Sequence, residues 1–399
     1  MNNLDAIQSA LRESNFDGWL FYDHHHRDPI AARILGLDPK AHITRRWYYF
    51  IPAIGEPRKL VHRVESGRLD TLPGDKTPYS SWQELHAGLA FILAGARRIA
   101  MQYSPNNDIM YVSMVDAGTV EFLRSIGKEI ISSADLVSQF EAVLTADQIA
   151  SHSVAQRAID AVLADGFKEI GRRLSPPYSS ATSKLTEYDM VVWLSEAMRR
   201  EGLVWENGPN VSANANSSDS HYEPTAEHSA PIREGDFVLI DIWGRPAPTE
   251  AVPNPIYYDI TWTGVVGRAP SEQEQLIFSI VRSARDAAIV AVEQAFAANR
   301  PICGFEADDA ARSVIRTDGY CEFFTHRTGH NIAQELHGSG AHLDNLETHD
   351  ARRILPNTCF SVEPGIYLPE FGIRSEVNML TAPGKAWVTG RIQQELVRI

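Results

Sequence analysis

The first 145 residues alternate between helical and strand-like patterns of apolar positions. Leu4, Ile7 and Leu11 recur at helical spacing and predict an amphipathic opening helix. Short apolar runs of strand character follow, and one longer run of helical period lies among them. The strand candidates are GWLFY, RRWYYFIPA, RKLVHRV and RRIAMQY, and the helix candidate is SWQELHAGLAFILAG. This alternation predicts an α/β domain over residues 1–145.

Residues 146–399 show one order of elements twice. Thr145 begins a T-x-x-Q capping box, Ser271 begins an S-x-x-E capping box, and each precedes a long periodic segment. Each long helix is followed by a shorter helix and then by strand-like runs. The predicted helices cover residues 145–174, 186–200, 271–299 and 305–317, with SPPYSS as a loop and residues 206–225 as an extended polar stretch. Although identity between the halves is low, the pattern predicts two copies of one unit with a pseudo-two-fold site between them.

Four acids inside apolar runs are the unusual feature of this second region. A carboxylate in such a run is expensive to bury unless it is paired, hydrogen-bonded or bound to a metal. The acids are Asp241 in FVLIDIW, Asp259 in IYYDITWTGVV, Glu363 in FSVEPGIY and Glu376 in GIRSEVNML, and the nearby histidines are His326, His330 and His337. Any one acid alone would indicate a salt-bridged strand residue or an exposed strand end. Four acids with a histidine cluster indicate a site for two divalent cations.

The composition is typical of a globular protein. The 399 residues are 44% hydrophobic and 22% charged, and this length favours two domains. The formal net charge of -14 argues against non-specific nucleic-acid binding and against attachment to an anionic membrane. The amino terminus has neither a basic segment nor an apolar signal-peptide core, so we expect a cytoplasmic protein.

The three cysteines, Cys303, Cys321 and Cys359, are an odd number without C-x-x-C spacing. We therefore expect reduced, buried thiols and no disulfide framework or cysteine zinc site. A catalytic cysteine paired with a histidine is a weaker alternative, because none of the three lies in an activating context.

The DHHHRDP segment contains three consecutive histidines, His24, His25 and His26. Consecutive side chains in an extended chain point to opposite faces, which hinders their binding to one ion. We therefore predict a solvated loop, at a subunit contact or at the rim of the substrate site.

The chain resembles the creatinase/methionine aminopeptidase superfamily in the order of its candidate ligands. These are Asp241, Asp259, His330, Glu363 and Glu376, and they occur with the segments EPGIY and GIRSE. The chain is most similar to the branch of Xaa-Pro dipeptidases (prolidases) and Xaa-Pro aminopeptidases, the M24B metallopeptidases. The resemblance implies an α+β pita-bread domain with a pseudo-two-fold repeat over residues 146–399, preceded by a smaller α/β creatinase-type domain over residues 1–145.

The resemblance also assigns roles to these five residues. Asp259 and Glu376 would bridge two divalent metal ions. Asp241 would chelate one ion, and His330 with Glu363 would complete the other. A metal-bridging hydroxide would attack the scissile carbonyl, with Glu363 as the general base. Manganese is expected from the family, while zinc and cobalt also tolerate this ligand set.

Five further residues match positions near the substrate in this family. His221 and His337 match histidines that contact the substrate, and His337 would meet the carbonyl and the developing oxyanion. His326 matches a histidine that lines the pocket for the proline side. Tyr367 and Arg374 match residues that support the site, and Arg374 could also meet a carboxylate. For each residue the alternative is a structural hydrogen bond or salt bridge.

Three features depart from the family pattern. Asp241 and Asp259 lie 18 positions apart, which predicts a lengthened, proline-rich hairpin loop over residues 244–256. Asn331 and Ala333 stand where the family has glycine, so side chains are expected where the family has bare backbone. Trp262 is not the commonest residue at its position, and we expect it to pack in the core.

A prolidase that hydrolyses dipeptides with proline in the second position is the favoured function. One alternative is an Xaa-Pro aminopeptidase for longer peptides, and another is a related hydrolase for a different substrate, such as an organophosphate-type ester. A third is a catalytically inactive binding protein on the same fold. A metal-free creatine hydrolase is disfavoured because the ligand carboxylates are present. By resemblance, the amino-terminal domain would contribute to a homodimer.

Overall fold

The structure is a computed structural model that describes residues 3–176, 178 and 184–399. The chain divides into two compact units, Met1–Glu141 and Ala142–Ile399. Part of the predicted SPPYSS loop, residues 177 and 179–180, lies outside the described residues. Among the helices of the described ranges, none has both the length and the apolar character needed to span a membrane.

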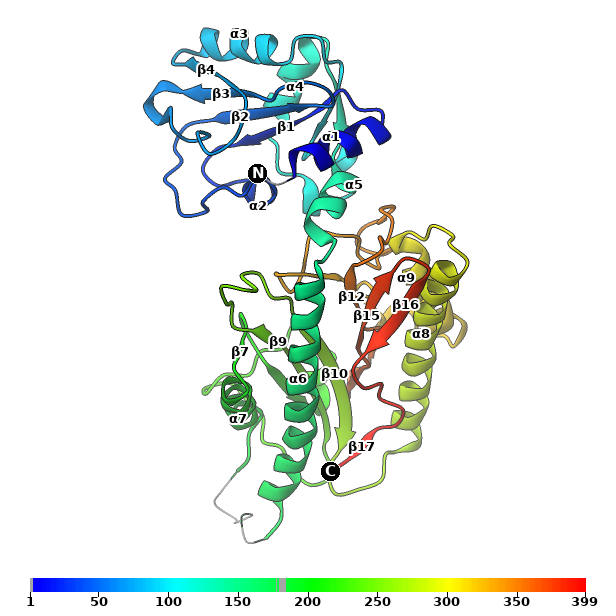
Figure 1. The fold of residues 1–399 in the computed structure, drawn as a ribbon. Helices are drawn as coiled ribbons and strands as arrows, with labels where there is room; N and C mark the ends of the chain where they lie inside the picture. Colours follow the sequence, from blue (N-terminus) through cyan, green and yellow to red (C-terminus); the bar gives the residue numbers. More distant parts are fainter. Residues whose placement is uncertain (1–2, 177, 179–183) are drawn as a thin grey trace. The chain divides into compact units, whose positions relative to one another are not determined.

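The first unit is built on a six-stranded sheet in the order β4-β3-β2-β1-β5-β6 (Figure 1). Its central strands β1, β2 and β3 pair antiparallel, whereas β4, β5 and β6 join in parallel. The strands are β1 (Gly18–Asp23), β2 (Trp47–Pro52), β3 (Arg58–His62), β4 (Asp75–Tyr79), β5 (Arg98–Met101) and β6 (Glu129–Ser132). The helices are α1 (Leu4–Glu13), α2 (Pro29–Leu35), α3 (Trp82–Ile92), α4 (Ala117–Ser125) and α5 (Ala134–Val137).

Both faces of this sheet are buried. Trp19 and Phe21 of β1 pack in a core with α1 and α2, while Leu20 and Tyr22 pack in a second core with α3 and α4. Successive side chains of a strand point to opposite faces, so a strand buried on both faces needs a continuous apolar run. The predicted strands and helices of this region are confirmed, and their alternation gives an α/β unit.

The second unit repeats the order of two helices followed by strands (Figure 1). The first half contains α6 (Ala146–Leu174), α7 (Glu187–Arg200), β7 (Leu203–Val204), β8 (Asn210–Ala213), β9 (Phe237–Pro246) and β10 (Tyr258–Val265). The second half contains α8 (Glu272–Ala297), α9 (Gly304–Thr317), β11 (Asn331–Ile332), β12 (Cys359–Val362), β13 (Gly365–Tyr367), β14 (Gly372–Arg374), β15 (Val377–Ala382), β16 (Lys385–Thr389) and β17 (Val397–Arg398). The capping boxes predicted at Thr145 and Ser271 are both confirmed.

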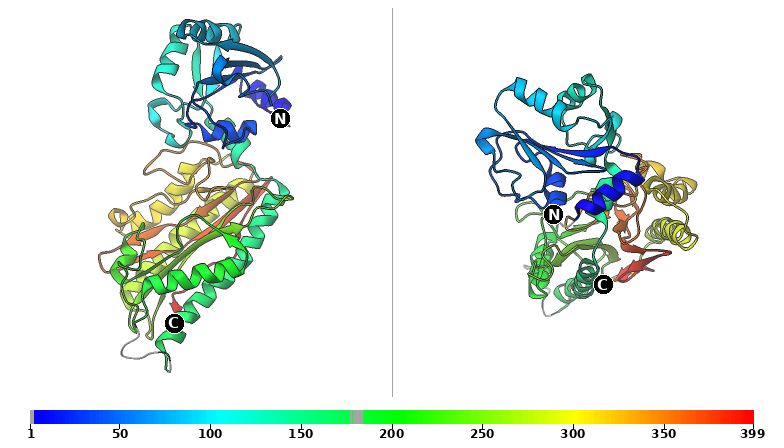
Figure 2. Two further views of the ribbon diagram at one scale, coloured as in Figure 1. Left: turned by 90° about the vertical axis from the view of Figure 1, so that its left-hand side faces the viewer. Right: turned by 45° about the horizontal axis from the view of Figure 1, so that its top comes forward.

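The helices of each half cover one face of its strands, and Figure 2 shows these strands running side by side with the helices packed on them. In β9, Val238, Ile240 and Ile242 pack in a core with α6 and α7. In β12, Phe360 and Val362 pack in a core with α8 and α9. The intervening residues of each strand therefore point to the opposite face, away from the helices.

The two halves meet where β10 adjoins β15. The Asn378 side chain accepts a hydrogen bond from the Asp259 N–H at 2.9 Å and donates one to the Asp259 carbonyl at 2.8 Å. The Glu376 N–H donates to the Thr261 carbonyl at 3.2 Å. These bonds hold the acids of the two halves next to one another, as the predicted pseudo-two-fold arrangement requires.

Two local predictions are corrected. Residues 206–225 are not simply extended, because β8 and a 3-10 helix at Asn214–Ser218 lie within them. None of the three cysteines forms a disulfide, and only Cys359 is buried. Cys321 is exposed because it begins a short 3-10 turn on the surface after α9.

The DHHHRDP segment is a loop between β1 and α2, as predicted. His25 and His26 take positive φ values of 60° and 56°, and both are exposed. The buried Asp23 carboxylate stabilises the loop by accepting hydrogen bonds from the His24 and Arg27 N–H groups.

His152 gives a pH-dependent prediction for the stability of the second unit. This fully buried residue of α6 places Nδ1 2.7 Å from the Tyr257 carbonyl and Nε2 2.9 Å from the Thr389 hydroxyl. Burial lowers the pKa of His152 to about 4, so the folded protein keeps the ring neutral where the unfolded chain, with a pKa of about 6.5, binds a proton. The contribution of neutral His152 to the free energy of unfolding is thus fully present above pH 6.5 and is lost as the pH falls toward 4.

Because of His152, we expect the free energy of unfolding to fall by about 2 kcal/mol when the pH is lowered from 7 to 5. Urea unfolding of His152→Gln should show a weaker loss over that pH range than the wild type, with His228→Gln on the exposed surface as the control. An unchanged pH slope in His152→Gln would contradict the assignment.

Candidate metal centre

The β9–β10 hairpin positions the first two acids. In the antiparallel register Asp241 lies opposite Thr261, and Asp259 lies opposite Trp243. Cross-strand neighbours share a face of the sheet. Val238, Ile240 and Ile242 face the helices. Asp241, Thr261, Asp259 and Trp243 therefore face the opposite side of the sheet, where the two acids are buried.

The three candidate ligands of the second half lie beside the ends of strands. The prediction that strands carry them is therefore wrong by one residue in each case. His330 immediately precedes β11, Glu363 follows β12, and Glu376 precedes β15. Pro364 has no N–H and ends the β12 ladder, while the Glu363 N–H donates to the Thr328 carbonyl at 2.7 Å. Leaving the ladder allows these side chains to turn toward the hairpin acids.

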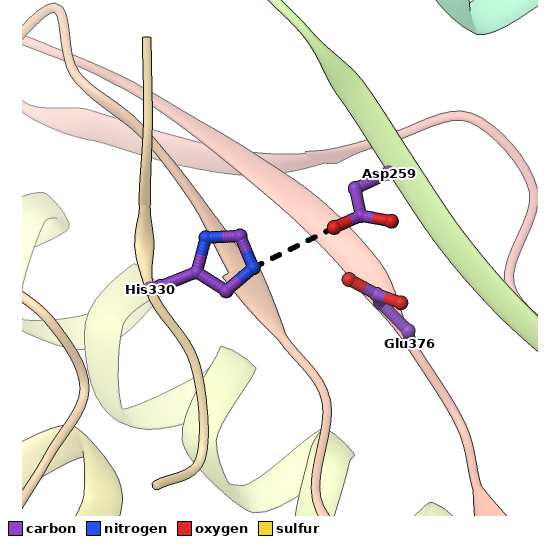
Figure 3. Close-up of side chains that lie close together, drawn as sticks. All are labelled: Asp259, His330 and Glu376. Carbon is purple, nitrogen blue, oxygen red and sulfur yellow. Dashed lines mark ion pairs between the residues drawn. The ribbon is translucent and has the colours of Figure 1, made fainter. Parts of the chain in front are cut away.

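Asp259, His330 and Glu376 come together in a buried cluster (Figure 3). One potential ligand atom from each lies within 4.8 Å of the others. His330 Nε2 is 3.5 Å from Asp259 Oδ2 and 3.3 Å from Glu363 Oε1. The opposite ring nitrogen, Nδ1, is 3.3 Å from the Asn331 carbonyl, which favours a proton there and leaves the Nε2 lone pair toward the acids.

The hydrogen bonding at this cluster fits a divalent metal ion. In the described part of the chain, Asp259 Oδ1 and Glu376 Oε1 are buried without a hydrogen-bond partner. The Thr261 hydroxyl lies 2.9 Å from Asp241 Oδ1 and 2.8 Å from Glu376 Oε2, but it has one proton to donate. Buried carboxylate oxygens without donors are what hard and borderline divalent cations bind.

The electrostatics of the acids lead to the same conclusion. Burial, with neighbouring carboxylates, raises the pKa of Asp259 and of Glu376 well above the usual range. Burial also raises the pKa of Asp241 to about 7, although Arg374 opposes the shift. A bound cation would compensate this repulsion and keep all three groups ionised.

Glu363 differs from these three acids. Burial alone would raise its pKa, but His330, Arg374 and His326 outweigh burial and lower it. The Ser361 hydroxyl donates to Glu363 Oε1 at 2.9 Å. Glu363 is therefore an ionised carboxylate beside the cluster, suited to accept a proton.

Arg374, Tyr367 and His326 form a polar chain beside the acids. Arg374 forms an ion pair with Asp241, and its Nη1 is 3.4 Å from the Tyr367 hydroxyl. That hydroxyl is 2.6 Å from His326 Nε2, while His326 Nδ1 is 2.7 Å from the Arg327 carbonyl. Burial lowers the pKa of His326 to about 4 and raises the pKa of Tyr367 to about 12, so both are neutral at physiological pH.

His337 and His221 lie on exposed parts of the second unit. The His337 ring centroid is 4.2 Å from that of His330. His330 and partial burial lower the pKa of His337, which keeps the ring neutral. His221 follows the 3-10 helix Asn214–Ser218, and its N–H donates to Asp219.

Sequence reasoning missed Thr261 and Asn378. Thr261 contacts Asp241 and Glu376 and accepts a hydrogen bond from Arg374 Nε at 3.0 Å, and Asn378 joins the halves at Asp259. Each is two positions after a candidate ligand, so strand periodicity puts Thr261 on the same face as Asp259. That spacing was the available signal. Trp262 packs at the edge of the core with α6 and α7, as predicted.

The family of the chain follows from a match over more than half its length. Residues 150–383 match the model described as metallopeptidase family M24. The chain belongs to metallopeptidase family M24.

Curated relatives match part of the chain. A putative Xaa-Pro aminopeptidase of Mycoplasma pneumoniae is 26% identical over 211 residues, which are 52% of this chain and 54% of that protein. An Xaa-Pro dipeptidase of Pyrococcus furiosus is 30% identical over 167 residues, which are 42% of this chain and 43% of that protein. The chain thus spans about half the length of the curated relatives it matches.

Solved structures confirm the expected α+β pita-bread fold. The dipeptidase PepE from Mycobacterium ulcerans superposes with a TM-score of 0.69 at 22% identity, covering 100% of this chain and 97% of that chain. The prolidase from Pyrococcus horikoshii OT3 gives a TM-score of 0.63 at 20% identity and covers 100% of both chains. At this identity the likeness is one of fold.

Removal and return of metal test this centre. Manganese bound to the folded state alone should raise the unfolding midpoint of chelator-treated protein, by about 2.7 kcal/mol in free energy at a concentration of 100 Kd. Calorimetric titration should show at least about 100-fold weaker binding for Glu376→Gln and Asp259→Asn, because each loses a ligand charge. Glu370→Gln on the exposed surface is the control, and wild-type affinity in both cluster variants would exclude the site.

Proposed function

We propose that this chain is a metal-dependent hydrolase that cleaves the Xaa-Pro bond of dipeptides. The observation that carries the proposal is the buried cluster of Asp259, His330 and Glu376, in which two carboxylate oxygens have no partner in the described residues. Membership of family M24 and similarity to proteins named Xaa-Pro dipeptidase support it.

Two divalent ions, manganese in the first instance, would be held by five residues. Asp259 and Glu376 would be shared between them, with Asp241 on one side and His330 with Glu363 on the other. Bound ions would polarise the scissile carbonyl and lower the pKa of a nucleophilic water. Arg374 already neutralises Asp241 in part, so the protein supplies one positive charge of its own.

Glu363 is the proposed general base. Its lowered pKa keeps it ionised. Ser361 donates to Oε1, and Oε2, 3.8 Å from Arg374 Nε, would accept a proton from water. The same carboxyl group then returns the proton to the proline nitrogen as the bond breaks. Without this return the leaving nitrogen would depart as an unstable anion.

The histidines are proposed to bind the peptide. A neutral His337 can donate one N–H to the carbonyl oxygen as negative charge develops on it. His221 would contact the substrate near the scissile bond from its exposed loop. His326 and Tyr367, both neutral, would line the proline side, and Arg374 would hold Tyr367 and Asp241 in place.

A site dedicated to proline has a physical reason. An Xaa-Pro bond has no N–H, and the ring fixes φ, so a peptidase that binds through that donor cannot hold it. Imidazole and aromatic walls such as His326 and Tyr367 suit the apolar ring.

An Xaa-Pro aminopeptidase for longer peptides is the second candidate, and a relative named putative Xaa-Pro aminopeptidase favours it. The two activities differ in whether the site has room beyond proline. An inactive binding protein is less favoured, because all five candidate ligand residues are present. A related hydrolase for another substrate ranks after the aminopeptidase.

The remaining proposals concern the whole protein. Residues 1–145 form a creatinase-type amino-terminal domain and residues 146–399 form the catalytic domain. The protein acts in the cytoplasm as a homodimer on small peptides, without nucleic-acid or membrane partners. Sedimentation of the full chain tests the dimer.

Hydrolysis of Ala-Pro and Ala-Pro-Ala tests the substrate class. Chelator-treated protein should be inactive, and Mn²⁺ should restore cleavage of Ala-Pro with little cleavage of the tripeptide. Preference for the tripeptide would establish the aminopeptidase instead. Inactivity on both peptides with bound Mn²⁺ would refute the proposed function.

Glu363→Gln tests the base. The amide keeps the size of the side chain but cannot take up the proton, so kcat should fall about 10²–10⁴-fold, with circular dichroism unchanged. Glu370→Gln, on an exposed turn of the same unit, should keep wild-type kcat. A Glu363→Gln protein with kcat near the wild-type value would show that another group accepts the proton.

A further inference from the structure

Asn331 follows the candidate ligand His330, but its side chain points elsewhere. It is 1% exposed, its amide nitrogen donates to the Cys359 carbonyl at 2.9 Å, and its amide oxygen accepts from the Gly340 N–H at 2.9 Å. Both polar atoms of the carboxamide are therefore satisfied inside the protein.

The main chain of Asn331 fixes the same loop. Its N–H donates to His342 Nδ1 at 3.0 Å, and its carbonyl accepts from the Gly338 N–H at 2.8 Å. One residue thus ties β12, Gly338, Gly340 and His342 together, and so closes the loop over residues 332–342.

Two glycines of the loop pack directly against the Asn331 side chain. A Cβ at Gly338 would lie 2.3 Å from Asn331 Oδ1, and one at Gly340 would lie 2.7 Å from Asn331 Cγ and 2.6 Å from the Ala142 Cβ. Neither glycine has a positive φ, so space and not backbone conformation excludes a side chain. Asn331 and these glycines therefore form one packing unit.

His337 is carried by this loop, directly before Gly338. Its own side chain is exposed, yet its ring stands 4.2 Å from the His330 ring. The backbone of His330 is held separately, because its N–H donates to Ser361 Oγ and its carbonyl accepts from the Ser361 N–H, both at 2.9 Å. The His330 ring also contacts the Asn331 carbonyl, but Asn331 is held in β11 by its pairing with β12. Moving residues 333–342 would therefore displace His337 while leaving His330 in place.

We propose that Asn331 is a positioning residue that sets the place of His337 beside the metal centre. The catalytic meaning of that place rests on the proposed function, whereas the positioning itself does not. Asn331 acts through the loop and does not touch the substrate.

A double-mutant cycle with Asn331→Ala and Gly338→Ala tests this. Each single variant should lower kcat for Ala-Pro, by up to about 100-fold for a 1 Å misplacement, and each should shift the His337 ring signals in NMR spectra. Asn331→Ala removes Oδ1 and Cγ, which the new Cβ at position 338 would meet at 2.3 and 3.2 Å, and leaves the Ala333 Cβ at 3.2 Å. The loss of kcat in the double variant should therefore be smaller than the product of the two single losses. Manganese affinity should stay within about threefold of the wild type in all three.

Asn345→Ala is the matched control, since its amide also bonds within this unit, to Asp309 and His349, but not to the loop. It should leave kcat and the His337 signals unchanged. Losses that multiply in the double variant, or unshifted His337 signals, would overturn the proposal, and so would a parallel loss of manganese affinity. If the wild type does not cleave Ala-Pro, the proposed function fails. The His337 ring signals of the single and double variants still test whether Asn331 positions His337.

Discussion

The electrostatic repulsion between three buried carboxylates, where β10 adjoins β15, is the constraint on which the second unit depends. Asp241, Asp259 and Glu376 lie in a region of low dielectric, where each raises the free energy of ionising the others. Arg374, which pairs with Asp241, and the single hydroxyl proton of Thr261 compensate only part of this negative charge. A divalent cation there would compensate this charge and keep the carboxylates ionised, and this is the physical link between the architecture and metal chemistry.

The rest of the second unit keeps that group in place. Each helix pair buries one apolar face of the strands, so the opposite face is free to be polar. Asn378 then fastens the two half-sheets through both hydrogen bonds of its side chain. The strand ends at Glu363 and Glu376 release these side chains from the ladder, which lets acids from distant parts of the chain reach one point.

Buried polar residues hold in place the loops that surround the acid cluster. Glu187, which is fully buried, accepts hydrogen bonds from the N–H groups of Ala213 and Ala230 and from the Tyr222 hydroxyl, and so it holds the loop of His221. Asn331 does the same for the loop of His337. Exposed histidines can thus be presented on loops that are fixed from beneath, where water does not compete for the hydrogen bonds.

The sequence by itself determined helices α1, α3 and α6 to α9, strands β1, β2, β3 and β5 of the first unit, and the repeated order of the second, because capping boxes and apolar periodicity are local signals. It also singled out Asp241, Asp259, Glu363 and Glu376, since acids in apolar runs are costly. Only the tertiary structure decided that Glu363 and Glu376 stand outside their strands, that Thr261 and Asn378 join the acids, and that the Asn331 side chain turns into the loop. These depend on contacts between residues far apart in sequence, and local pattern carries no information about which partners the fold will bring together.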